Sequence, residues 1–246
     1  MATRQRKRSA GAATGGASQT PDTIPNQVFL ALPWKAVRPR YESIVERLRT
    51  KSPLSFVIVG RNDKQDAEDL LEVIKNRVAA SSYAIFDATG GNANVSLEYG
   101  YAEALDIPRI LYLSTHGAAR RTSADAPIIA DLAGKRRNQY KQENALSRLL
   151  HEFSREHAYT VRFERFLQDS FKSRQPGQKK RLRALALKVI HSLDGARQVR
   201  RADIVQQLQA DVSRYTPDEI DDMIKRLHKS KLVRSQQGPH ARVHVT

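Results

Sequence analysis

The sequence predicts an α/β protein in which helices flank a parallel sheet, followed by a small α+β domain. Three observations support this fold class. Short apolar runs alternate with stretches of helical periodicity from residue 26 onward. The joins between them are short, which is typical of parallel strands connected by crossover helices. After residue 181 the periodicity stays helical until two short strand-like segments close the sequence.

Four apolar runs in the first half of the chain predict strands that are buried on both faces. They are Val28–Leu32, Phe56–Val59, Tyr83–Phe86 and Arg109–Leu113. Between them, apolar residues recur at helical spacing over 41–48, 67–78 and 95–105. Right-handed crossovers between such strands give a flavodoxin/Rossmann-like parallel sheet with flanking helices. A last strand is expected at Ile128 and Ile129, and helices are expected over 143–171.

The last part of the chain has the pattern of a winged-helix domain. Helical periodicity covers 182–193 and 204–208, and Thr216-Pro217-Asp218-Glu219 is a strong helix start with a capping box. Two strands, 232–234 and 243–245, are expected around Gln237-Gly238-Pro239. We therefore predict a disordered basic tail at 1–25, an α/β domain at 26–171, a linker at 172–181 and a winged-helix domain at 182–246.

Composition limits the chemistry and the compartment. The 246-residue chain has no cysteine, which excludes disulfides and thiolate chemistry. No apolar run reaches the roughly 18 residues of a membrane span, so we expect a cytoplasmic protein with no membrane contact. No metal or cofactor is expected, because the histidines lack metal-ligand spacing and there is no Gly-x-Gly-x-x-Gly or Walker loop. The sequence leaves homo-oligomer formation open.

Positive charge is concentrated at the two ends of the chain. The net charge is +16, and residues 172–246 contain 17 Lys or Arg against 7 Asp or Glu, whereas residues 26–171 contain 21 against 18. This distribution predicts nucleic-acid contact through the C-terminal domain. The residues expected to contact phosphates are Lys225, Arg226, Lys229, Lys231, Arg234 and Arg242.

Four carboxylates at the start of the would-be recognition helix oppose such contact, because they repel phosphates. They are Asp218, Glu219, Asp221 and Asp222. Dimerisation, docking of another partner, or a charge that serves only solubility are the alternatives for this basic domain.

Residues 86–102 are the most informative segment for function. A predicted strand ends here, Gly90 and Gly91 allow a tight turn, and a helix follows. Ligands of open α/β sheets bind at such carboxyl ends. With Asn94 as the predicted N-cap, Glu98 lies in the first helical turn, where the helix dipole favours the ionised carboxylate. An ionised carboxylate beside a pocket is suited to attack or to stabilise a sugar cation.

This segment resembles the nucleoside 2-deoxyribosyltransferase family and its TIR-like relatives. The matching residues are Asn92-Ala93-Asn94-Val95 and Glu98-Tyr99-Gly100-Tyr101-Ala102, and the order of elements agrees over 26–150. The chain departs from the family at Ala93, where Pro is usual, and at Trp34, near which the family has an aromatic hydroxyl. The resemblance implies cleavage or transfer at the N-glycosidic bond of a nucleoside, nucleotide or NAD-like ligand.

The resemblance implies that Glu98 is the nucleophile or the stabiliser of the sugar cation. The expected ligand-binding residues are Leu32, Pro33, Trp34, Gly60, Asp87, Gly90, Gly91, Asn92 and Asn94. Three alternatives stay open. In the first, the protein is a DNA-binding regulator whose pocket binds a nucleotide without turning it over. In the second, it is a TIR-like bacterial defence protein whose enzyme half is gated by its basic half. In the third, Glu98 only stabilises its own helix and Gly100 only allows close packing.

Overall fold

The first part of the protein is built on a five-stranded parallel sheet. The computed structural model describes residues 23–33, 37–59, 67–115, 137–194, 198–210, 215–236 and 241–246. The strands are β1 (Ile24–Ala31), β2 (Ser55–Val57), β3 (Ser81–Asp87), β4 (Arg109–Ser114) and β5 (Arg137–Tyr140). They pair in the order β2-β1-β3-β4-β5, and every pairing is parallel. This is the flavodoxin-like order, so the predicted α/β fold class is confirmed.

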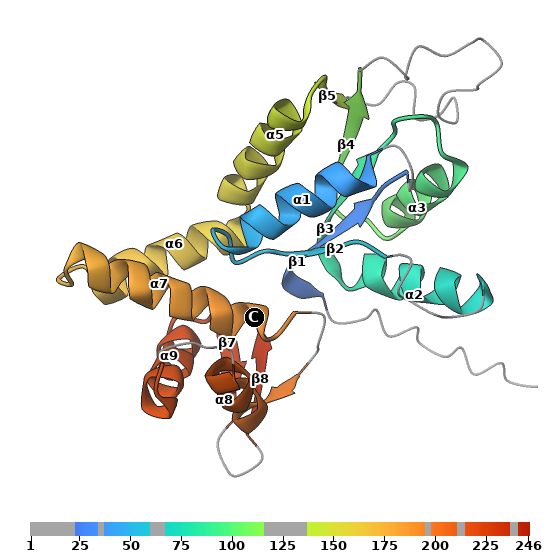
Figure 1. The fold of residues 1–246 in the computed structure, drawn as a ribbon. Helices are drawn as coiled ribbons and strands as arrows, with labels where there is room; N and C mark the ends of the chain where they lie inside the picture. Colours follow the sequence, from blue (N-terminus) through green and yellow to red (C-terminus); the bar gives the residue numbers. More distant parts are fainter. Residues whose placement is uncertain are drawn as a thin grey trace, which may run out of the picture.

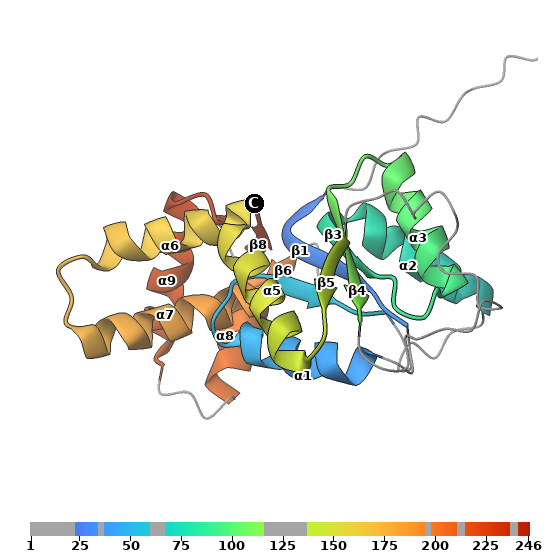
Figure 2. The same cartoon turned by 90° about the horizontal axis from the view of Figure 1, so that it is seen from above.

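Helices cover both faces of this sheet (Figure 1, Figure 2). Val28 and Leu30 of β1 belong to one buried cluster, and Phe29 and Ala31 belong to the other. The first cluster includes side chains of α1 (Arg38–Arg49), α5 (Glu143–Glu156) and α6 (Ala158–Phe171). The second includes side chains of α2 (Ala67–Ala79) and α3 (Ala93–Ala104). Burial on both faces explains why these strands are continuous apolar runs.

Strand β5 is the element of the sheet that the sequence did not predict. Its four residues, Arg-Asn-Gln-Tyr, pair with β4 at the edge of the sheet, and only Tyr140 is buried. A short, polar edge strand has no apolar pattern by which it could be recognised. The strand expected at Ile128 and Ile129 lies outside the described residues, as do the turn at 237–239 and nearly all of the N-terminal tail.

The C-terminal part combines three helices with a small antiparallel sheet. The helices are α7 (Pro176–His191), α8 (Arg201–Ala210) and α9 (Pro217–Lys229). The strands are β6 (Val199–Arg200), β7 (Val233–Ser235) and β8 (Arg242–Val245), paired in the order β6-β8-β7. The predicted start of α9 is confirmed: Thr216 caps the Glu219 backbone N–H, and the Glu219 carboxylate accepts the Thr216 N–H.

Residues 176–181 of the predicted linker at 172–181 are helical. Only residues 172–175 lie between α6 and α7, because Pro176 occupies the first position of a helix rather than a flexible segment. One buried cluster also runs through both parts of the chain. Across this contact the Tyr159 hydroxyl donates a 2.9 Å hydrogen bond to the Leu232 carbonyl, and His191 Nε2 lies 2.9 Å from the Ser52 carbonyl oxygen.

Candidate active site

The turn from β3 into α3 places the residues of the sequence motif. Gly90 and Gly91 have φ angles of 78° and 59°, a region that favours glycine, and they redirect the chain after the strand. Asn92 then caps the helix, since its Oδ1 accepts the Asn94 backbone N–H at 2.9 Å. The prediction that Asn94 is the N-cap is therefore wrong: an asparagine two residues earlier already satisfies this donor.

This shift by two residues changes the environment of Glu98. The helix begins at Ala93, and its first turn contains no acidic residue, so Glu98 lies in the second turn. The helix dipole acts mainly within the first turn. Burial dominates instead and raises the pKa of the Glu98 carboxyl from 4.5 to about 7. The expectation that the helix dipole favours the ionised form of Glu98 is thus corrected, because burial dominates and the carboxyl changes its charge near neutral pH.

Glu98 lines a pocket at the carboxyl ends of β1 and β2. Its walls come from the end of β1, the residues after β2, and helices α1, α2 and α3; they are Phe29, Leu30, Ala31, Leu32, Arg38, Ile58, Val59, Leu70, Ile74, Asn92, Asn94, Val95 and Glu98. The chain leaves β1 toward one face of the sheet and returns to β3 from the other. In open α/β sheets such a switch point is the usual place for a ligand.

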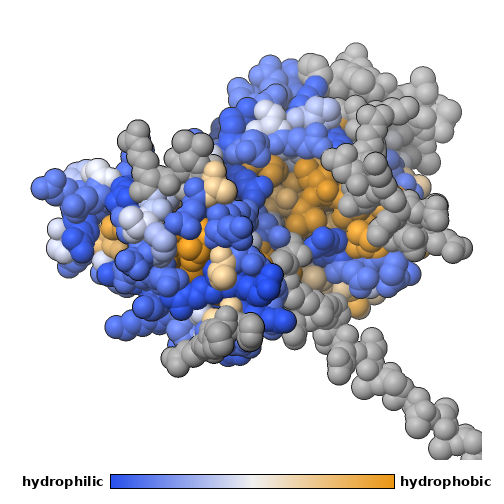
Figure 3. Space-filling view, turned by 60° about the horizontal axis from the view of Figure 1, so that its bottom comes forward, coloured by the Kyte–Doolittle hydropathy of each residue, from blue (hydrophilic) through white to orange (hydrophobic). Residues whose placement is uncertain are grey.

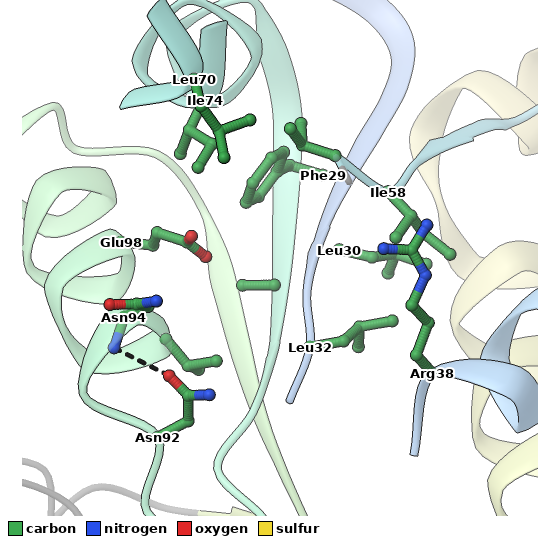
Figure 4. A pocket seen from close by; sticks show the side chains of 13 residues that line it. Phe29, Leu30, Leu32, Arg38, Ile58, Leu70, Ile74, Asn92, Asn94 and Glu98 are labelled. Atoms are coloured by element: carbon green, nitrogen blue, oxygen red, sulfur yellow. Dashed lines mark hydrogen bonds between the residues drawn. The ribbon is translucent and has the colours of Figure 1, made fainter. Parts of the chain in front are cut away.

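Polar groups enter this pocket from two sides (Figure 4). Asn94 and Glu98 project from α3 on one side of β1, together with Asn92 from the turn before it, and Arg38 lies on the other side near Ile58. The Arg38 Nε donates a 2.6 Å hydrogen bond to Glu42, and the arginine side chain is only 18% exposed. The pocket therefore offers a carboxyl, two amides and a guanidinium around apolar walls.

Four of the predicted site residues line this pocket, namely Leu32, Asn92, Asn94 and Glu98. Pro33 is buried beside it, and Gly90 and Gly91 shape the turn that leads to it without lining it. Trp34 and Gly60 lie outside the described residues. Sequence reasoning missed Arg38, which stands in no recognisable motif, and the apolar contributions of Phe29, Ile58, Leu70 and Ile74.

Asp87, also predicted to contact the ligand, is turned away from the pocket. Its carboxylate is fully buried and accepts hydrogen bonds from the hydroxyls of Tyr41 at 2.9 Å and Tyr140 at 2.6 Å. The Thr89 backbone N–H donates a third bond at 2.9 Å. Burial raises the pKa of Asp87, while these donors act in the opposite direction. In this structure Asp87 therefore fastens α1 and β5 to the end of β3.

An apolar surface continues from the pocket along α2 and α3. Leu70, Ile74, Asn94 and Glu98 border a second hollow, which is completed by Leu71, Lys75, Leu97 and Tyr101. Leu97 is 62% exposed and Leu71 is 43% exposed. Figure 3 shows that apolar residues gather in a hollowed area of the α/β part, with hydrophilic residues beside it. Glu98 thus lies at the border between the polar pocket and this apolar surface.

The predicted nucleic-acid contacts lie on one helix, on two strands and in the turn after the helix. Lys225, Arg226 and Lys229 lie on α9, whereas Arg234 and Arg242 lie on β7 and β8. All of these except Arg226 are exposed, and Arg226 forms a 2.7 Å ion pair with Asp222. The sixth residue, Lys231, is exposed in the turn after α9 with a φ of 56°.

The residues that the structure describes contain no group of three or more His, Cys, Asp or Glu that could hold a metal ion. Within the same ranges, no helix combines the length and the apolar character needed to cross a bilayer.

Two solved structures are similar to part of this chain. The CMP N-glycosidase of Clostridium botulinum matches with a TM-score of 0.39 and 16% identity, covering 52% of this chain and 98% of the other. A 2-deoxyribosyltransferase from Leishmania mexicana matches with a TM-score of 0.40 and 15% identity, covering 52% and 98%. No family model matches the sequence, and no curated protein does so either.

Proposed function

We propose that the pocket binds a nucleoside, nucleotide or NAD-like ligand and acts on its N-glycosidic bond. The observation that carries this proposal is the Glu98 carboxyl, whose pKa burial raises to about 7, at the switch point of a parallel sheet. A carboxyl with a perturbed pKa that lines a cleft is a candidate for a catalytic group. The resemblance of residues 92–102 to deoxyribosyltransferases, noted from the sequence, points to the same chemistry.

The reaction needs the ionised form of Glu98. As nucleophile, the carboxylate forms a bond to the anomeric carbon while the bond from that carbon to the base nitrogen breaks. The base leaves with the electron pair of that bond. A nucleobase that was neutral in the substrate takes a proton from water, whereas the cationic nicotinamide of an NAD-like ligand leaves as a neutral molecule without one. Water or a second base then displaces Glu98 from the sugar. As stabiliser, the same carboxylate lowers the energy of the sugar cation without forming a bond. A positive sugar beside Glu98 favours its ionisation in either case.

The other walls of the pocket suit the remaining parts of such a ligand. Asn92 and Asn94 offer amide donors and acceptors for sugar hydroxyls or base edges. Phe29, Leu32 and Ile58 offer apolar surface for the planar base.

The test is base release from purified protein incubated with NAD and a panel of nucleosides and nucleotides, with and without DNA. Glu98→Gln keeps the size of the side chain and removes its charge, so release is expected to fall by at least a hundredfold. Glu72→Gln is the matched control, because Glu72 lies on α2, outside the pocket, with a 66% exposed side chain. Unchanged release by Glu98→Gln would show that the catalytic assignment is wrong.

A second candidate function is that of a nucleotide-sensing regulator without turnover. The basic C-terminal part favours it, since residues 172–246 carry a net charge of +10 and combine three helices with a small antiparallel sheet. In this version a winged-helix domain contacts nucleic acid, and the pocket binds a nucleotide without cleaving it. Ligand-dependent thermal stabilisation without base release supports it.

A third version joins the two as a cytoplasmic, TIR-like defence protein whose glycosidase half is gated by nucleic-acid contact. It requires base release that increases when DNA is added. Equal release with and without DNA contradicts this version while leaving the glycosidic proposal intact.

A further inference from the structure

The outer face of the C-terminal sheet carries a row of basic side chains. The strand register pairs Arg200 with Arg242 and Arg234 with His244. Because side chains alternate between the two faces of a strand, these four residues share one face. The opposite face carries Val199, Val233 and Val243, which pack in the core. We call the row of Arg200, Arg234, Arg242 and His244 the basic sheet face.

This arrangement works against the stability of the sheet. Arg200 and Arg242 are like charges directly opposite each other on paired strands, an arrangement that is destabilising. Strands β6, β7 and β8 contain no Asp or Glu that could offset them. Arg200 forms a 2.9 Å ion pair with Asp203, and Arg242 donates a 3.3 Å hydrogen bond to the Gln198 amide oxygen. Within the described residues, neither Arg234 nor Arg242 forms an ion pair, and all three arginines are exposed.

Helix α9, the recognition helix expected from the sequence, carries acidic residues as well as basic ones. Three of its acidic residues are neutralised by arginines of the same part of the chain. Glu219 pairs with Arg181 at 2.7 Å, Asp221 with Arg201 at 2.6 Å and Asp222 with Arg226 at 2.7 Å. Three guanidiniums in this region are therefore committed to internal ion pairs, including that of Arg226.

We infer that the basic sheet face is the surface that binds the phosphate backbone of a nucleic-acid duplex. Guanidinium groups form charge-assisted, bidentate hydrogen bonds with phosphate oxygens, and a phosphate ligand relieves the cross-strand repulsion. The strands carry no Phe, Tyr or Trp, on which single-stranded bases would stack, so the surface fits a duplex. Phosphate contacts of this kind do not depend on sequence. The inference rests on the proposed nucleic-acid function and names the surface that performs it.

The test measures how affinity for a short labelled DNA duplex of mixed sequence depends on salt, using the full chain. Each phosphate contact adds about 0.9 to the steepness of the plot of log affinity against log salt concentration. Arg234→Gln/Arg242→Gln is expected to lower that steepness by about 1.8 and the affinity at least tenfold near physiological salt.

The matched control is Lys179→Gln/Lys180→Gln, which removes the same charge from exposed positions on α7, away from the sheet. It is expected to keep nearly all of the steepness. A third variant, Lys225→Gln/Lys229→Gln, tests the competing surface on α9. Circular dichroism and thermal melting establish that each variant is folded.

The outcomes separate the inference from the function on which it rests. Loss confined to Arg234→Gln/Arg242→Gln supports the basic sheet face. If affinity and salt dependence fall equally in the control, or only in the α9 variant, the basic sheet face is not the binding surface, although the chain still binds nucleic acid. If the unmodified chain shows no salt-dependent duplex binding, both the inference and the nucleic-acid proposal are wrong.

Discussion

The hydroxyl of Tyr140 donates a 2.6 Å hydrogen bond to the carboxylate of Asp87, 53 residues earlier in the chain. The same carboxylate oxygen accepts the hydroxyl of Tyr41 at 2.9 Å, and all three side chains are buried. This triad joins β5 and α1 to the end of β3. Because α1 also carries Arg38, the triad fixes one wall of the candidate active site.

Asp87→Ala is expected to destabilise the protein by about 2–4 kcal/mol, since it leaves two tyrosine hydroxyls buried without their acceptor. Tyr140→Phe removes a single bond and is expected to cost about 1–2 kcal/mol. Urea unfolding of both variants and of the double variant measures their coupling. Additive losses in the double variant would mean that the hydrogen bond contributes little to stability.

Glu98→Gln is expected to stabilise the protein above pH 7. The folded-state pKa of about 7 lies above the ordinary value of 4.5, so ionising Glu98 costs stability, and the cost develops as pH rises from 4.5 to 7. The gain is on the order of 1–3 kcal/mol at pH 8 and disappears below pH 4.5. Urea unfolding at pH 8 and pH 5 measures it. If Glu98→Gln raises the free energy of unfolding equally at both pH values, the Glu98 carboxyl does not have a raised pKa.

His157 is expected to make the protein sensitive to mild acid. Burial, assisted by Arg162, lowers the pKa of His157 from 6.5 to about 4, and its neutral Nδ1 caps α6 by accepting the Tyr159 N–H. The unfolded chain therefore takes up the proton first, and stability is lost as pH falls from 6.5 toward 4. The loss at pH 5 is about 1–2 kcal/mol relative to pH 7.

His157→Asn keeps a capping group without a titrating ring, so the difference in unfolding free energy between pH 7 and pH 5 is expected to shrink. Unfolding by urea at the two pH values gives this difference for each protein. If the variant loses as much stability as the unmodified chain, another group is responsible for the acid sensitivity.

Thr216→Ala is expected to cost about 1 kcal/mol, because it removes the side-chain half of the capping box at the start of α9. Thr50→Ala serves as the comparison. Its exposed hydroxyl donates only to the Arg47 carbonyl at the end of α1, so its loss is expected to be within a few tenths of a kcal/mol. Thermal melting of the two variants tests the difference.

Local patterns in the sequence determined much of this protein. Four continuous apolar runs defined four of the strands in the parallel sheet, and Thr216 to Glu219 defined a helix start to the residue. Each of these signals depends on the spacing of side chains within a few residues, so it can be recognised without knowing where the rest of the chain lies. The helix that carries Glu98 was recognised in the same way.

Only the tertiary structure decided what the side chains of these elements do. Asp87 is closed off because Tyr41 and Tyr140 arrive from other elements, and Arg200 opposes Arg242 because β6 and β8 pair across 42 residues of chain. Glu98 has a raised pKa because several segments bury it around one pocket. Burial and pairing are set by segments distant in sequence, whereas helix and strand patterns are local; for this reason the elements were predictable and the chemistry of the site was not.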